Sequence, residues 1–217
     1  MTAARALSGL FALLAALHLG ALLADATTLV QLTKPALTPV LAASVLLRGG
    51  PRPLVAALLC GCGGDVLLQI GGDTAFLAGM GCFAAGHLCY LALFTRSGRP
   101  RTAWWVAAGC GAVWLGSTAA LWPGLDPGLR VPVAAYSLLL TAMALGALRA
   151  GRWTGLGGAL FLLSDGLIAA GLADWPRPPA PQFWIMATYL AAQYLLTAGL
   201  LRVAAREAPL RALPAAA

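Results

Sequence analysis

The sequence predicts an all-α integral membrane protein, a bundle of eight transmembrane helices. Hydrophobic residues are 60% and charged residues 10% of its 217 residues, whereas soluble domains have about 45–50% and 25%. The mean hydropathy is +0.84, and no segment shows the period-two alternation of outer-membrane barrel strands. So few polar side chains cannot cover a water-soluble globule. This excludes a cytosolic enzyme, a secreted disulfide scaffold and a disordered segment.

The apolar segments lie between charged residues and Gly/Pro clusters, and a spanning helix needs roughly 20 mostly apolar residues. They predict spans at about 6–24, 35–47, 54–71, 75–94, 103–122, 131–149, 153–173 and 183–203. We expect the short second span to begin at Lys34-Pro35, because proline is tolerated in the first turn of a helix. The connecting loops are too short to hold a soluble domain, so residues 1–217 form a single transmembrane domain.

The distribution of charges supports eight spans, which place both termini and every even-numbered loop on one side of the membrane. Only three cations, Lys34, Arg130 and Arg177, fall on the other side. The first side holds eleven: Arg5, Arg48, Arg52, Arg96, Arg99, Arg101, Arg149, Arg152, Arg202, Arg206 and Arg211. The positive-inside rule then predicts cytoplasmic termini, with the first span retained as a membrane helix and not cleaved as a signal peptide.

The net charge of +7 is explained by this topology, so no nucleic-acid partner is expected. Arginine outnumbers lysine 13 to 1, which favours a GC-rich genome and hence a bacterial cytoplasmic membrane. Two histidines on distant spans, and a Cys60-Gly61-Cys62 segment without a second pair, do not form a metal-binding pattern. We therefore expect no metal and no other cofactor.

Two acids lie inside predicted spans, and ionisable residues at membrane depth are functional candidates because they are costly to bury. Asp65 and Asp165 are 100 residues apart, and each lies roughly 16–18 Å from the cytoplasmic end of its predicted span. Their local sequences are similar, Gly64-Asp65-Val66 against Ser164-Asp165-Gly166. This similarity suggests a four-plus-four parallel repeat that would place both acids on one central cavity.

Other polar residues accompany the two acids at helical spacing. His87 and Tyr90 are three positions apart, and Tyr189 and Gln193 are four apart, so each pair shares a helix face. Lys34 and Tyr136 are further candidates from the second and sixth spans. The alternative for each is a structural role, because tyrosine and glutamine in spans often hydrogen-bond neighbouring helices.

Five segments resemble the YhhN family, which includes the mammalian transmembrane-protein-86 lysoplasmalogenases. They occur in the family's order: Thr33-Lys34-Pro35, Gly64 to Leu68, Phe83 to Tyr90, Gly158 to Asp165 and Thr188 to Gln193. The resemblance implies hydrolysis of the vinyl-ether bond of lysoplasmalogens, a membrane lipid substrate, to a fatty aldehyde and a glycerophospho-base. Two features depart from the family: the short second span, and Gly166 where a small or polar residue is usual.

Hydrolysis of an enol ether requires an acid that protonates carbon and a carboxylate that steadies the resulting oxocarbenium ion and activates water. Glycosidases meet the same requirement with two carboxyl groups. We expect Asp65 and Asp165 to be this catalytic pair and to share one proton, with the donor undetermined. The expected supporting or substrate-binding residues are Lys34, for the lipid phosphate, together with His87, Tyr90, Tyr136, Ser164, Tyr189 and Gln193.

Three other functions fit parts of the pattern. An intramembrane aspartyl protease also uses two acids, but here they lie on the third and seventh spans and no Pro-Ala-Leu motif follows. A proton-coupled transporter would use parallel repeats and midplane acids, although few Gly or Pro breaks interrupt these spans. A non-catalytic lipid-binding or structural membrane protein is the third alternative. Release of aldehyde by purified protein distinguishes the hydrolase from all three.

Overall fold

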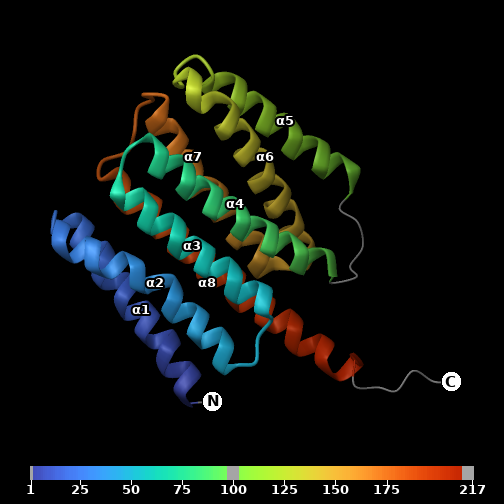
Figure 1. Ribbon diagram of the computed structural model, residues 1–217. Helices are drawn as coiled ribbons and strands as arrows, with labels where there is room; N and C mark the ends of the chain where they lie inside the picture. The colour runs from blue at the N-terminus through green and yellow to red at the C-terminus, as the bar shows by residue number, and fades with distance from the viewer. Residues whose placement is uncertain (1, 97–102, 212–217) are drawn as a thin grey trace.

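The computed structural model describes residues 2–96 and 103–211, and within them the chain forms eight α-helices and no strand (Figure 1). The helices are α1 (Thr2–Leu23), α2 (Thr27–Leu47), α3 (Arg52–Ile70), α4 (Asp73–Arg96), α5 (Trp104–Leu121), α6 (Pro127–Ala150), α7 (Arg152–Leu172) and α8 (Pro181–Arg211). All eight are long and apolar enough to cross a membrane. The predicted fold class is therefore confirmed. Arg99 and Arg101, assigned above to one side of the membrane, lie outside the described residues.

The helices run roughly parallel or antiparallel to one another, with α1 and α2 at one end of the molecule and α5 at the other (Figure 1). The most extensive contacts join α3 to α4 and α7 to α8. These two pairs hold corresponding places in the two halves of the chain, as the suggested repeat requires. The repeat itself stays a prediction.

The predicted start of the second span at Pro35 is wrong. Helix α2 begins at Thr27, so that Pro35 and Pro39 both lie inside it. A proline in a helix removes one backbone hydrogen bond, and Pro39 therefore leaves the carbonyl of Pro35 without its usual partner four residues on. The thiol of Cys62 in α3 donates to that carbonyl, with Sγ and O 3.3 Å apart. A contact between helices thus replaces the missing bond, which sequence patterns alone do not reveal.

Glycines allow the paired helices to approach each other closely, as is typical of membrane proteins. A Cβ at Gly157 of α7 would lie 3.0 Å from the backbone nitrogen of Leu196 and 3.1 Å from the carbonyl oxygen of Ala192 in α8. A Cβ at Gly86 of α4 would lie 3.2 Å from the carbonyl oxygen of Ala57 in α3. In both pairs the backbones are so close that a side chain would push the helices apart.

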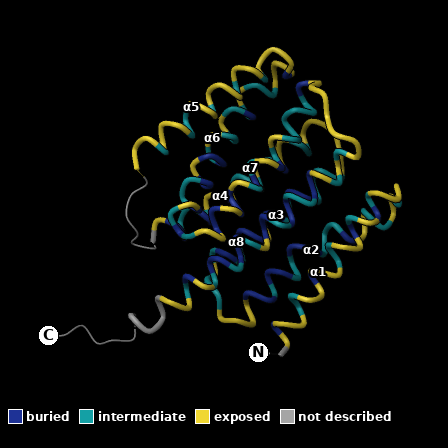
Figure 2. The backbone as a smooth tube through the Cα atoms, turned by 180° about the vertical axis from the view of Figure 1, so that it is seen from behind, coloured by how far each residue is buried: buried dark blue, intermediate teal, exposed yellow. Residues whose placement is uncertain are grey.

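Helix α5 is the exception to this close packing. The main apolar core takes buried side chains from the seven other described helices and none from α5, which has no buried residue at all. Figure 2 shows its tube almost entirely in the colours of exposed and intermediate residues. Its contacts are mainly with α6, where the indole of Trp114 donates to the hydroxyl of Ser137 at 3.0 Å.

We expect Gly157→Leu to destabilise the protein by about 1–3 kcal/mol, because the new side chain overpacks a contact between two backbones. The measurement is thermal unfolding of the purified protein in detergent. Gly116→Leu in α5 is the matched control, since a Cβ there meets nothing within 4 Å. Equal melting temperatures for the two variants would contradict close packing of α7 against α8.

Candidate active site

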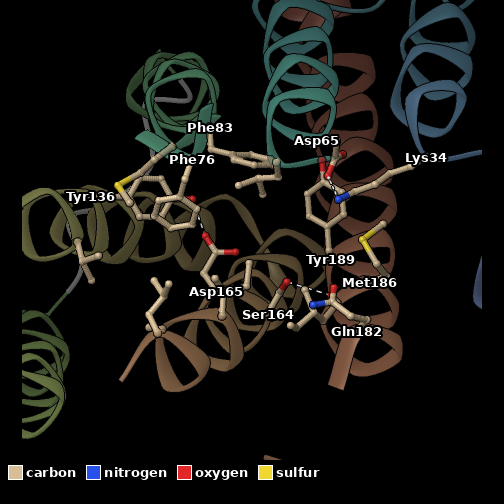
Figure 3. Close-up of a pocket in the computed structure, with 17 residues that line it drawn as sticks. Lys34, Asp65, Phe76, Phe83, Tyr136, Ser164, Asp165, Gln182, Met186 and Tyr189 are labelled. Carbon is tan, nitrogen blue, oxygen red and sulfur yellow. Dashed lines mark hydrogen bonds and ion pairs between the residues drawn. The ribbon is translucent and has the colours of Figure 1, made fainter. Parts of the chain in front are cut away.

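A cavity of about 260 Å³ lies inside the bundle, between residues of α2, α3, α4, α6, α7 and α8. Asp65 of α3 and Asp165 of α7 face it from different walls (Figure 3). Each acid stands 13 positions after the arginine that begins its helix, Arg52 in α3 and Arg152 in α7. The two acids therefore lie at matched positions, roughly 20 Å along their helices.

Asp65 forms an ion pair with Lys34 inside the bundle. Lys34 Nζ is 3.5 Å from Asp65 Oδ1, and the two side chains are only 14% and 4% exposed. Buried charges are tolerated when they are paired, so each group makes the other acceptable at this depth. The second carboxylate oxygen, Oδ2, is buried and has no hydrogen-bond partner among the described residues. Asp65 lines the cavity, so its carboxyl group borders that space.

A chain of hydrogen bonds begins at side chains outside the cavity lining and ends at Tyr189, which lies beside Asp65. The hydroxyl of Tyr90 donates to Gln193 Oε1 at 2.6 Å, and Gln193 Nε2 donates to the hydroxyl oxygen of Tyr189 at 3.1 Å. The oxygen of Tyr189 is thus an acceptor, and its own proton is left for the cavity side, where Asp65 lies (Figure 3). Gly61 makes room for this chain, because a Cβ there would lie 2.9 Å from the Tyr189 hydroxyl.

A second chain of hydrogen bonds reaches Asp165. The hydroxyl of Tyr136 donates to Asp165 Oδ2 at 2.5 Å, and His87 Nε2 lies 3.0 Å from the same hydroxyl. Because the single Tyr136 proton goes to the carboxyl, His87 Nε2 is the donor in the other bond. The ring of Phe161 packs edge-on against His87 with centroids 4.8 Å apart, which holds the imidazole in place. Asp165 thus has a neutral phenol beside it where Asp65 has an ammonium.

The nine residues proposed from the sequence are brought together. Six line the cavity: Lys34, Asp65, Tyr136, Ser164, Asp165 and Tyr189. Ser164 is buried and donates to the backbone oxygen of Ile185 at 3.0 Å, so it also joins α7 to α8. His87, Tyr90 and Gln193 lie behind the cavity in the two hydrogen-bonded chains. The catalytic and binding roles of all nine stay predictions.

The remaining lining of the cavity is mostly apolar and was not identified from the sequence: Leu68, Phe76, Met80, Phe83, Val133, Ile168, Ala169, Leu172, Gln182, Ile185 and Met186. Helical spacing could have indicated two of these residues. Phe83 lies four positions before His87, and Met186 three before Tyr189, so each shares a face with a candidate residue. The described residues contain no group of three or more His, Cys, Asp or Glu side chains placed to hold a metal ion.

Comparison with known proteins identifies the family of this chain. The model of the YhhN family matches residues 29–200, a range that includes every residue of the candidate site. The chain belongs to the YhhN family. No solved structure matches it.

Two relatives illustrate how far the similarity to the YhhN family extends. Lysoplasmalogenase TMEM86B of Homo sapiens is 37% identical over 155 residues, which cover 71% of this chain and 66% of the human protein. Lysoplasmalogenase of Mycobacterium bovis is 37% identical over 161 residues, covering 68% of this chain and 60% of that protein. The chain thus matches a little under two thirds of the length of these relatives. It is a multi-pass membrane protein, with eight helices of spanning length in its described part.

We expect Lys34→Met to destabilise the protein by about 3–5 kcal/mol, because it leaves the Asp65 carboxylate buried without a partner. The double variant Lys34→Met/Asp65→Asn removes both charges and should recover most of that loss. Unfolding in detergent measures both, with Arg5→Met as a control at an exposed cation. If the single and the double variant lose the same stability, the effect of Lys34→Met does not come from breaking its ion pair with Asp65.

Proposed function

We propose that this protein is a lysoplasmalogenase, which hydrolyses the vinyl-ether bond of a lysoplasmalogen to a fatty aldehyde and a glycerophospho-base. The observation that carries the proposal is a pair of acids facing one cavity in the membrane, one of them paired with an ammonium. Membership of the YhhN family supports it, as do relatives named lysoplasmalogenase. The substrate is then a membrane lipid.

The charges around the cavity suggest which acid carries the proton. One ammonium, Lys34, balances one carboxylate, and a second uncompensated charge would be costly at this depth. Asp65 is the group next to Lys34, so it is the carboxylate. Asp165, next to the neutral phenol of Tyr136, is the carboxylic acid. Its Oδ2 accepts from Tyr136, which leaves Oδ1 to carry the proton towards the substrate.

Catalysis then proceeds in three steps. Asp165 transfers its proton to the vinyl carbon that is remote from the ether oxygen, and the double-bond electrons form the new C–H bond, leaving an oxocarbenium ion. Asp65 stabilises this cation and removes a proton from water as the water oxygen bonds to the carbon next to the ether oxygen, giving a hemiacetal. The hemiacetal collapses to aldehyde and alcohol, and its proton transfers leave Asp165 protonated and Asp65 ionised again.

The other residues act on these two carboxyls. Tyr136 holds Asp165 in place, and His87 is a positioning residue that directs the Tyr136 proton to it. Tyr189 orients water beside Asp65, and Gln193 and Tyr90 fix the Tyr189 hydroxyl. Lys34 lines the cavity as well as pairing with Asp65, so it is also placed to attract a lipid phosphate.

The excess of arginine over lysine, 13 to 1, supports a location in a bacterial cytoplasmic membrane. The distribution of the arginines supports an orientation with both termini in the cytoplasm. In that orientation, the ends of α1, α3, α5 and α7 and the starts of α2, α4, α6 and α8 lie on the outer side. Lys34 is seven positions after the start of α2, and Asp65 is five before the end of α3. The catalytic residues would then lie in the outer half of the bilayer.

We expect Asp65→Asn and Asp165→Asn each to lower the rate of aldehyde release by roughly 10²–10⁴-fold, the usual contribution of a general acid or base. The assay follows aldehyde formed from lysoplasmalogen by purified protein in detergent or vesicles. Asp25→Asn is the control, because Asp25 is exposed in a loop with a φ of 52° that asparagine also tolerates. Full turnover in either cavity variant removes that residue from the mechanism, and flux of intact lipid without aldehyde indicates a carrier.

A reaction run in heavy water should give aldehyde with one deuterium on the carbon next to the carbonyl, because the proposed acid protonates that carbon. Mass spectrometry of the trapped aldehyde measures the label. Unlabelled aldehyde kept in the same buffer corrects for exchange without enzyme. Product without deuterium would show that the ether is cleaved by another route.

A further inference from the structure

A second cavity adjoins the first on the far side of Asp165. It is a groove of about 670 Å³ between α5, α6 and α7, within the roughly 300–1,000 Å³ range of small-molecule sites. Val133, Tyr136, Asp165 and Ala169 border both spaces. The Asp165 carboxyl therefore lies where the first cavity, which also contains Asp65, meets this groove.

The surface of the groove is almost entirely apolar. Its polar side chains near the middle already have partners in the protein: the indole of Trp114 donates to Ser137, and the hydroxyl of Thr141 donates to the backbone oxygen of Ser137. Asp165 is its single ionisable carboxyl. A hydrocarbon chain fits such a lining, because it offers no hydrogen bonds and gains van der Waals contacts with the apolar side chains.

The groove has the length and direction that a lipid chain needs. Along α7 it extends from Ala169 past Asp165 back to Gly155. The part from Asp165 to Gly155 is ten helical positions or about 15 Å, which is half of the roughly 30 Å hydrocarbon core. The first cavity extends the opposite way, to Leu172 near the end of α7 and Gln182 near the start of α8. The two spaces lie side by side at the level of Asp165 and Ala169, which border both, and only the groove continues along α7 to Gly155.

We propose that this groove binds the single hydrocarbon chain of a lysolipid whose polar head lies in the first cavity. The bond that joins chain and head then lies at Asp165. This assignment rests on the proposed function for the reaction, and it adds the binding site for the chain and the source of chain-length selectivity. The occupant enters from the bilayer beside α5, which has no buried residue.

A substitution at the far end of the groove tests the assignment. Gly109 of α5 lines the groove, and a Cβ there meets nothing within 4 Å, so Gly109→Phe fills space without displacing backbone. The phenylalanine ring takes the space of the chain end and excludes it sterically. We expect Gly109→Phe to lower kcat/KM for a long-chain lysoplasmalogen by roughly tenfold or more and to leave a short-chain one within about twofold.

Gly116→Phe is the matched control on the same helix, because Gly116 is equally open and lies outside the groove lining. Its chain-length profile should equal that of the unmodified protein. If Gly109→Phe and Gly116→Phe change long-chain and short-chain substrates alike, the groove does not hold the chain.

Photo-crosslinking tests the binding of the hydrocarbon chain in the groove independently of the proposed reaction. The probe is a saturated alkyl-ether lysophospholipid with a diazirine near the end of its chain, which the enzyme cannot hydrolyse. We expect labelled peptides from α5 and from the first half of α7, and less label in Gly109→Phe. Label confined to other helices overturns the chain site even if lysoplasmalogen is hydrolysed. Label in the groove without any hydrolysis supports the chain site and overturns the proposed reaction.

Discussion

The ion pair between Lys34 and Asp65 is the constraint on which the rest of the site depends. In a membrane a lone carboxylate is so costly that it must be neutralised or paired, and one lysine is the ammonium present at this cavity. Two acids and one cation make the cavity neutral when one acid is protonated. The same charge balance that lets the bundle fold therefore supplies the two unequal carboxyls that acid–base chemistry requires.

The two chains of hydrogen bonds keep the surroundings of Asp65 and Asp165 different. Tyr90, Gln193 and Tyr189 form one chain on the Asp65 side, whereas His87 and Tyr136 form another that ends on Asp165. Both chains cross between helices, and nearly every polar atom in them has a partner, as buried networks require. Rigid support of this kind holds each carboxyl at one position, so that little reorganisation is needed when charge moves.

Much of this organisation can be predicted from the sequence, because the bilayer imposes simple rules. Length and hydropathy indicate eight spans, and the expense of charge at membrane depth is enough to single out Asp65 and Asp165. Helical spacing likewise predicts that His87 shares a face with Tyr90, and Tyr189 with Gln193. It does not reveal that His87 and Tyr90 serve different acids, because that division depends on which neighbouring helix each side chain meets.

The start of α2 is mispredicted for a related reason. A proline at position 35 normally indicates the beginning of a helix, whereas α2 begins at Thr27 and contains both Pro35 and Pro39. With this earlier start, Lys34 lies within the helix and its ammonium is 3.5 Å from Asp65. A thiol from α3 satisfies the carbonyl that Pro39 leaves free, so a contact between helices supports a proline inside α2 close to the residue that determines the charge of the site.

The sparse packing of α5 has a consequence for motion. Displacing a helix that buries no side chain breaks few contacts, so its outward swing costs far less free energy than parting α3 from α4 or α7 from α8. Such rigid-body movements of a loosely held element occur in microseconds to milliseconds. The bundle can thus remain intact if this edge opens to the bilayer, where the proposed hydrocarbon chain would enter the groove.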